Sequence, residues 1–179
     1  ASSPGSNDYG NLYNTANTQF DFTTESAIAS QTAEDWIDSN SLVSVSDCTA
    51  TIKTDNSDQG LEIQNTSATE GEIRLGAITT VAGRTYEVKY SHTNDDESYV
   101  DCPIKLKVGT SAGAEDVYTL NDGGASVTAT FVATGTSTHI SFGPSTSTDD
   151  HRVRLKTIQI REQGTASGWT DADQQLDIP

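Results

Sequence analysis

Short runs in which apolar and polar residues alternate recur along this chain and limit what it can fold into. In residues 84–92 (RTYEVKYSH), for example, polar residues separate Tyr86, Val88 and Tyr90. Successive side chains of a β-strand point to opposite faces, so a period of two predicts a strand with one buried face. Clusters of Gly, Asn, Asp and Ser separate the runs, as expected for turns. The pattern predicts an all-β chain.

The predicted strands share this alternation and are all short. They are residues 19–22, 42–46, 48–54, 61–66, 72–80, 84–93, 102–110, 116–120, 125–134, 138–144 and 151–162. In the last strand, Val153 and Leu155 belong to the inward set. That set resumes at Ile158 after a one-residue slip at Lys156–Thr157, which predicts a β-bulge.

Short strands at this spacing are typical of a sandwich or barrel, and we interpret the fold as a jelly-roll β-sandwich of two antiparallel sheets. The sandwich spans residues 19–162, between an N-terminal arm (1–18) and a C-terminal arm or linker (163–179). One helical turn is predicted at 30–37, where Ser or Thr precedes Glu34 as in a capping box. The expected core consists of the inward apolar residues Phe22, Ile52, Leu61, Ile63, Ile73, Leu75, Tyr86, Val88, Tyr90, Ile104, Leu106, Val108, Val127, Phe131, Ile140, Phe142, Val153, Leu155, Ile158 and Ile160.

The chain is strongly acidic, with a net charge of −16. Such a surface repels nucleic acid and anionic lipid, so neither is an expected partner. No apolar run approaches the roughly 20 residues of a membrane span, and no membrane insertion is expected. The motifs G-x-S-x-G, H-E-x-x-H and the P-loop do not occur, so we expect a protein that is not an enzyme and binds no cofactor. There is no signal peptide, and whether the chain is a fragment of a longer protein stays open.

One acidic cluster is a weak metal candidate, whereas the two cysteines are not. Cys48 and Cys102 each begin a predicted strand and match no metal-binding pattern, which leaves a disulfide and two buried thiols as alternatives. Asp95, Asp96 and Asp101 supply the oxygen ligands that calcium prefers, but their spacing is not that of a calcium loop. A solvated loop is the favoured interpretation of this cluster, with a structural calcium as the alternative.

All ten Lys and Arg residues fall in or beside predicted strands. Several share the outward face of their strand, so one sheet is expected to present a cationic stripe. One interpretation is a solvated face with cross-strand pairs to Glu72 and Glu87, each worth at most about 1 kcal/mol. The other is a docking face for an acidic glycan or for the acidic arms of neighbouring copies.

Sugar sites usually stack a ring on an exposed aromatic side chain, with polar side chains around it. Tyr99 and Tyr118 lie at loop or strand margins and are the predicted stacking residues, and His92 lies at the end of its strand. With the outward lysines, the candidate ligand-binding residues are Tyr99, Tyr118, His92, Lys89, Lys105 and Lys107.

The order of these features resembles the jelly-roll carbohydrate-binding modules of the family 4/9 type. The matching segments are an early FDF, a following Trp36, TTVAGRTYEVKYSH, ASVTATFVATGTSTHISF and a closing VRLKTIQIRE, which together cover about 19–162. In that family an acidic closing strand often helps to hold a structural calcium. Here Lys156–Thr157 stands in the corresponding place, which puts such a calcium in doubt.

The final segment, GWTDADQQLDIP (168–179), resembles linkers of bacteriophage structural proteins. The polar arms contain the apolar anchors Tyr9, Tyr13, Trp169 and Ile178, a pattern typical of segments that become ordered on a partner. We therefore expect a non-catalytic structural, decoration or fibre module of a bacteriophage virion. It would assemble through its arms with copies of itself or with a larger scaffold, and contact surface glycans. The alternative is a carbohydrate-binding accessory module of a secreted enzyme or adhesin. The expected location is a virion or the extracellular space.

Overall fold

A computed structural model describes residues 18–21, 43–55, 58–93 and 102–163, and every regular element in these ranges is a β-strand. In spatial order, one sheet contains β10 (Ser126–Val132), β7 (Thr85–Thr93), β12 (Arg152–Glu162), β4 (Asp58–Asn65) and β3 (Cys48–Asp55), and β1 (Thr18–Asp21) also pairs with β12. The other contains β2 (Val43–Ser46), β5 (Glu72–Leu75), β11 (Ser137–Pro144), β8 (Ile104–Gly109) and β9 (Tyr118–Asp122), and β6 (Ile78–Thr79) also pairs with β11. We name them the β12 sheet and the β11 sheet.

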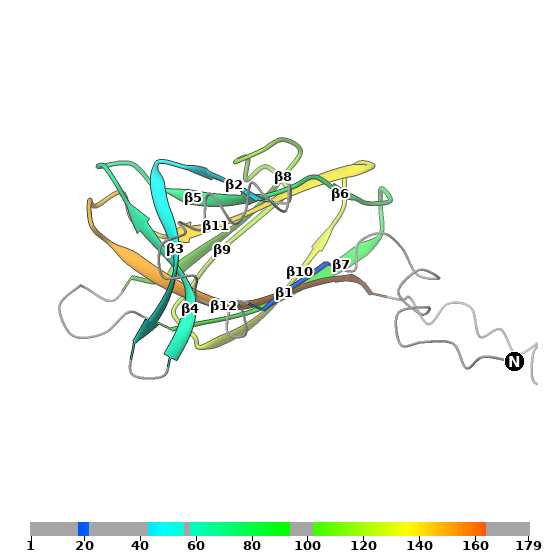
Figure 1. Ribbon diagram of the computed structural model, residues 1–179. Coiled ribbons are helices and arrows are strands. Elements are labelled where there is room, and N and C mark those ends of the chain that lie inside the picture. Colours follow the sequence, from blue (N-terminus) through cyan, green and yellow to red (C-terminus); the bar gives the residue numbers. More distant parts are fainter. Residues whose placement is uncertain (1–17, 22–42, 56–57, 94–101, 164–179) are drawn as a thin grey trace, which may run out of the picture.

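The two sheets lie face to face, and all of their strand pairs are antiparallel (Figure 1). The chain crosses repeatedly between them, for example from β4 to β5, from β7 to β8 and from β9 to β10. Because consecutive strands often belong to opposite sheets, neighbours within a sheet come from distant parts of the sequence. This arrangement confirms the predicted jelly-roll β-sandwich.

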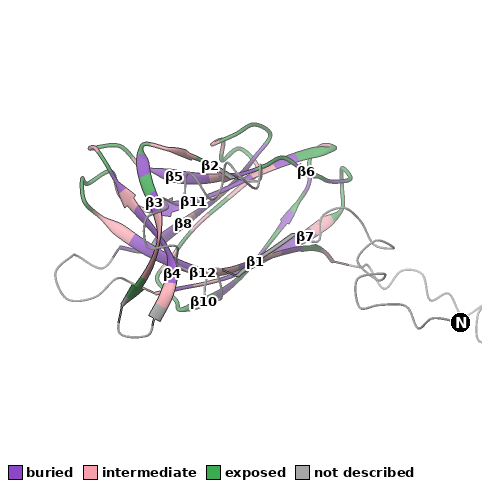
Figure 2. Ribbon diagram, in the orientation of Figure 1, coloured by how far each residue is buried: buried purple, intermediate pink, exposed green. Residues whose placement is uncertain are grey.

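Residues of both sheets are buried (Figure 2), and their apolar side chains form one core. The predicted core residues are buried, apart from Ile52, which is half-buried because β3 lies at the edge of its sheet, and Phe22, which lies outside the described residues. The prediction missed small residues, whose type does not separate a buried from an exposed position: Cys48, Ala50, Cys102, Ala129 and Ala133. The predicted helical turn at 30–37 also lies outside the described residues.

The predicted bulge in β12 is confirmed. Leu155 pairs with His92 on β7, and the next paired residue of β12 is Thr157, opposite Ser91. Lys156 is therefore the extra residue. The bulge absorbs it, so that Leu155 and Ile158, three positions apart, both point into the core.

Two details differ from the predicted elements or decide between alternatives. The single strand predicted at 72–80 is divided into β5 and β6 by the exposed Gly76 and Ala77, because a glycine weakens a strand interior. Cys48 and Cys102 are both buried free thiols rather than a disulfide. Burial raises the pKa of the Cys48 thiol to about 11.

Candidate functional site

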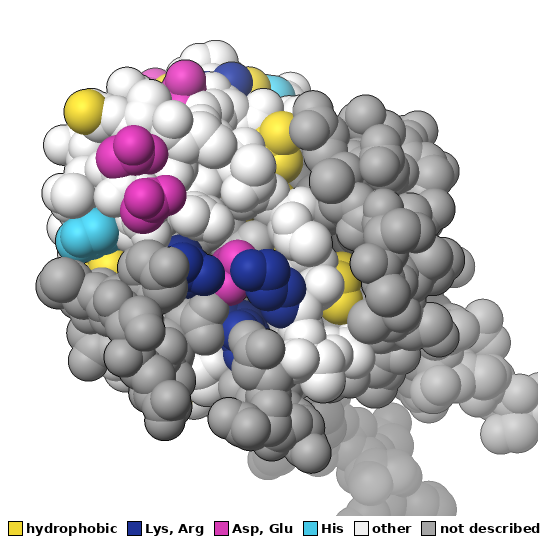
Figure 3. Space-filling model, turned by 60° about the vertical axis from the view of Figure 1, so that its left-hand side comes forward, with side chains coloured by type: hydrophobic (Ala, Val, Ile, Leu, Met, Phe, Trp, Pro, Cys, Tyr) yellow, Lys and Arg dark blue, Asp and Glu magenta, His cyan; other side chains and the backbone are white. Residues whose placement is uncertain are grey.

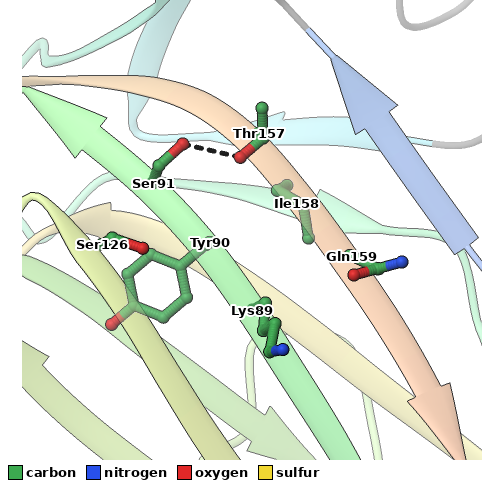
Figure 4. A pocket seen from close by; sticks show the side chains of 7 residues that line it. All are labelled: Lys89, Tyr90, Ser91, Ser126, Thr157, Ile158 and Gln159. Atoms are coloured by element: carbon green, nitrogen blue, oxygen red, sulfur yellow. Dashed lines mark hydrogen bonds between the residues drawn. The ribbon is translucent and has the colours of Figure 1, made fainter.

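An open groove lies across β10, β7 and β12 (Figure 4). Its volume is about 270 Å³, slightly below the roughly 300 Å³ at which small-molecule pockets usually begin. The lining residues are Lys89, Tyr90, Ser91, Ser126, Thr157, Ile158 and Gln159. The side chains of Tyr90 and Ile158 are buried in the core, so these two residues contribute backbone to the floor.

Strand register sets the polar side chains of the groove in two rows. Ser126, Ser91 and Thr157 are cross-strand partners, and the Ser91 and Thr157 hydroxyl groups are hydrogen-bonded at 2.6 Å. In the next row, Lys89 lies opposite Gln159 on β12. Cross-strand partners on one face have Cβ atoms about 5 Å apart, so each row is a compact set of hydrogen-bonding groups.

A carboxylate on the outer face, Glu87, lies two residues from Lys89 along β7. Arg161 contacts the Oε1 atom of Glu87 through Nε at 2.8 Å and Nη2 at 2.7 Å, and Gln163 Nε2 donates to Oε2 at 3.1 Å. The Lys89 ammonium is more distant, at 3.5 Å from Oε1. Burial alone would raise the pKa of the Glu87 carboxyl, but Gln163 and Arg161 outweigh it and hold that pKa below its ordinary value.

The groove offers hydrogen bonding and a positive charge. Serine and threonine hydroxyls and the Gln159 amide both donate and accept, whereas the Lys89 ammonium only donates. The seven described lining residues include no carboxylate, histidine or cysteine. Their chemistry is therefore suited to holding a polar ligand.

A second charged group lies farther along the outer face of the same sheet, where basic side chains surround one acidic side chain (Figure 3). Glu62 on β4 is 2.6 Å from Lys53 Nζ and 3.4 Å from Arg152 Nη1, and Arg154 Nη2 lies at 3.9 Å. Glu62 and Arg154 are both almost fully buried. The ion pairs of this cluster connect β3, β4 and β12. Because both charges are desolvated, loss of one partner would leave a buried charge unpaired.

Lys105 and Lys107, two of the predicted ligand residues, lie on the β11 sheet and not near Lys89. Lys105 Nζ is 3.0 Å from both Glu70 and Glu115, and Lys107 Nζ is 3.0 Å from Glu72. Burial alone would lower the pKa of Lys105, but Glu70 and Glu115 outweigh it and raise that pKa. The cations thus do not form the single stripe expected from the sequence, because they are divided between both sheets and paired with carboxylates.

His92, another predicted ligand residue, lies inside the sandwich at 2% exposure. Its ring stacks on Tyr90 with 6.2 Å between centroids, and Tyr90 meets the edge of Phe142 at 5.1 Å. Among the described residues, neither imidazole nitrogen of His92 nor the Tyr90 hydroxyl has a hydrogen-bond partner. Burial raises the pKa of that hydroxyl. His92 therefore does not reach the surface where a ligand would meet it.

Of the two predicted stacking residues, Tyr118 is not among those that line the groove. Tyr118 on β9 is half-buried and packs against the core, and Tyr99 lies outside the described residues. The metal candidates Asp95, Asp96 and Asp101 also lie outside them, as do the arm anchors Tyr9, Tyr13, Trp169 and Ile178. In the part of the chain that is described, no group of three or more metal-binding side chains occurs, and no helix is long and apolar enough to span a membrane.

Of the predicted ligand residues that the structure describes, only Lys89 lines the groove. The prediction missed Ser91, Ser126, Thr157 and Gln159 because single polar residues on a strand carry no motif. The one available signal was the predicted bulge, which puts Thr157 and Gln159 on the outward face with Lys89. The sequence alone does not show that β7 and β12 are neighbours in the sheet.

The sequence matches no protein-family model and no curated protein. Solved structures do resemble the fold. An arabinose-bound GH51 α-L-arabinofuranosidase matches with a TM-score of 0.57 at 10% identity, over 85% of this chain and 27% of the enzyme. A low-affinity xylan binding module, CBM86, from Roseburia intestinalis matches with a TM-score of 0.48 at 12% identity, over 82% of this chain and 96% of the module.

The C-terminal CBM6 of a marine laminarinase from Zobellia galactanivorans matches with a TM-score of 0.45 at 10% identity, over 81% of this chain and 98% of the module. At such identities the likeness shows a shared fold alone. This chain shares a fold with part of the arabinofuranosidase, and it spans about a quarter (27%) of the length of that enzyme.

Proposed function

We propose that this chain is a non-catalytic, extracellular carbohydrate-binding module, and that the groove across β10, β7 and β12 holds a short stretch of glycan. The carrying observation is the lining of the groove. Sugar hydroxyls both donate and accept hydrogen bonds, and the side chains of Ser91, Ser126, Thr157 and Gln159 do the same. A fold by itself does not determine a function, so the chemistry of this site supports the proposal.

The expected binding is weak. A neutral hydrogen bond made in exchange for water contributes about 1 kcal/mol. Three or four such bonds in a shallow groove correspond to a Kd of about 1 mM. The described lining residues place no aromatic ring against the ligand, so they lack the contribution that stacking usually makes.

Replacement of Gln159 by alanine tests the proposal. Its side chain is half-buried in the groove, and Gln159→Ala removes one donor and one acceptor without emptying the core. We expect affinity electrophoresis on a panel of soluble plant and microbial polysaccharides to show a retarded protein. Gln159→Ala should weaken the retardation roughly five- to tenfold.

The matched control is Thr119→Ala, an exposed strand position on the β11 sheet. It should bind like the unchanged protein. If no polysaccharide retards the protein, or if the two variants lose binding equally, the groove is not a glycan site.

Assembly into a virion through the arms stays a prediction. Its anchors lie outside the described residues, and no feature of the described sandwich favours it over glycan binding. The role of Tyr99 as a stacking residue also stays a prediction, because Tyr99 lies outside the described residues. A platform formed by Tyr99 would add to the groove rather than replace it.

A further inference from the structure

Lys89 supplies the positive charge of the groove. Of the seven described lining residues it alone is charged, and its side chain retains 46% of its exposure. Lys89 and Gln159 are cross-strand partners on β7 and β12, and both line the groove (Figure 4). From such positions an ammonium group and an amide can both donate to the oxygens of one carboxylate.

The nearby Glu87 carboxylate does not use up this charge. Arg161 and Gln163 already donate to both of its oxygens at 2.7–3.1 Å, while Lys89 lies at 3.5 Å. A charge-assisted bond is strongest near 2.7–2.9 Å, so Arg161 is the principal ion-pair partner of Glu87 and Lys89 contributes little. Lys89 can therefore move to an incoming anion while Glu87 stays paired.

Among the described side chains, the outer face of the β12 sheet carries more cations than carboxylates. Its described outward side chains include five cations, Lys53, Lys89, Arg152, Arg154 and Arg161, and two carboxylates, Glu62 and Glu87. On the β11 sheet the cations Arg74, Lys105 and Lys107 meet the carboxylates Glu70, Glu72 and Glu115. The side chains of Asp21, Asp55 and Asp58 lie outside the description.

The net charge of −16 opposes a polyanion at long range. At about 0.15 M salt, exposed charges are screened beyond roughly 8 Å. A carboxylate in contact with Lys89 is closer than that, so this screening does not remove its attraction to Lys89. Selection for an anion is therefore a short-range property of the groove.

We infer that the groove selects glycans that carry a carboxylate, such as uronic acid polymers. Lys89 and Gln159 bind the carboxylate, and the row of hydroxyl groups holds the adjoining sugar. This inference rests on the proposed glycan binding, and it adds the class of glycan.

Calorimetric titration with polygalacturonate, alginate and hyaluronate, each beside its methyl-esterified form, tests the inference. Esterification removes the charge and keeps the sugar. At least one acidic polymer should bind about tenfold more tightly than its ester. Lys89→Gln should abolish that difference. The control Lys53→Gln makes the same charge change at a 40% exposed side chain beyond the groove, and it should keep the difference.

The outcomes separate the inference from the proposed function. Equal binding of acids and esters overturns the inference and leaves glycan binding standing. If only neutral polysaccharides retard the protein in the electrophoresis panel, the inference is also overturned and glycan binding also stands. Equal losses in Lys89→Gln and Lys53→Gln assign the effect to overall charge and also overturn it. Self-association that Lys89→Gln abolishes, with no glycan binding, would make an acidic segment of a second copy the occupant, and both proposals would fall.

Discussion

At the scale of single residues, His92 places an ionisable ring between the two sheets with no hydrogen-bond partner among the described residues. Burial lowers the pKa of its imidazole below the ordinary value of 6.5, while the Asp122 carboxylate and the nearby carbonyls of Asp122 and Gly124 act in the opposite direction. The folded protein therefore keeps His92 neutral at pH values at which the unfolded chain protonates it. A buried neutral histidine costs stability in acid.

The free energy of unfolding should fall as the pH drops from 7 to 5, by at most about 1.4 kcal/mol per pH unit, the limit for one proton. The sign follows because the unfolded state binds the extra proton. His92→Phe keeps a ring against Tyr90, removes the ionisable group and should lose this pH dependence. Urea unfolding at several pH values measures it. The pKa values of Glu70 and Glu87 are lowered, so these carboxylates stop stabilising the fold only below about pH 4.5, outside this window.

A suitable control is His139→Gln, at a half-exposed histidine on the outer face of the β11 sheet. This variant should retain the pH dependence of the unchanged protein. Equal slopes in His92→Phe and the unchanged protein would show that burial of His92 does not set the acid sensitivity.

At the scale of elements, the bulge of β12 keeps the apolar side chains of the strand on its inner face on both sides of Lys156. Lys156 is the extra residue between Leu155 and Thr157, so its deletion should leave a regular strand with the same inward and outward sets. Deletion of Gln159 instead brings Ile158 and Ile160 into adjacent positions, and one of them must then point to solvent. We expect the Lys156 deletion to fold with a similar Tm and the Gln159 deletion to lose more than about 2 kcal/mol.

Thermal unfolding followed by circular dichroism compares these two deletions. Equal destabilisation by both would mean that Lys156 is an integral part of the ladder and that the alternation has been misassigned.

Strands and their faces could be predicted from the sequence because alternation is local. The inward set of β7, with Tyr86, Val88 and Tyr90, is visible within a few residues, and so is the slip at Lys156. The division of 72–80 was missed because a glycine followed by an apolar residue also fits a continuous strand. The groove was not predictable by this route, since Ser91 and Thr157 meet only after the order of strands in the sheet is known.

At the scale of the whole molecule, the two outer faces of the sandwich differ in how their described lysines are paired and exposed. On the β11 sheet, the side chains of Lys105 and Lys107 are largely covered, at 15% exposure, and they are tied to Glu70, Glu72 and Glu115. This ladder stabilises the sheet and presents little to a ligand. On the β12 sheet, the groove keeps Lys89 exposed beside a neutral polar floor. Recognition is therefore expected on one face only.

Titration of isotope-labelled protein with a soluble oligosaccharide, followed by NMR of the backbone amides, tests this claim most directly. The account predicts shifts that saturate and that are concentrated on β7, β10 and β12 around Lys89, Ser91, Ser126, Thr157 and Gln159. The NMR signals of the amides of β5, β8 and β9 should not shift. Saturable shifts centred on the β11 sheet, with the groove amides unmoved, would contradict it.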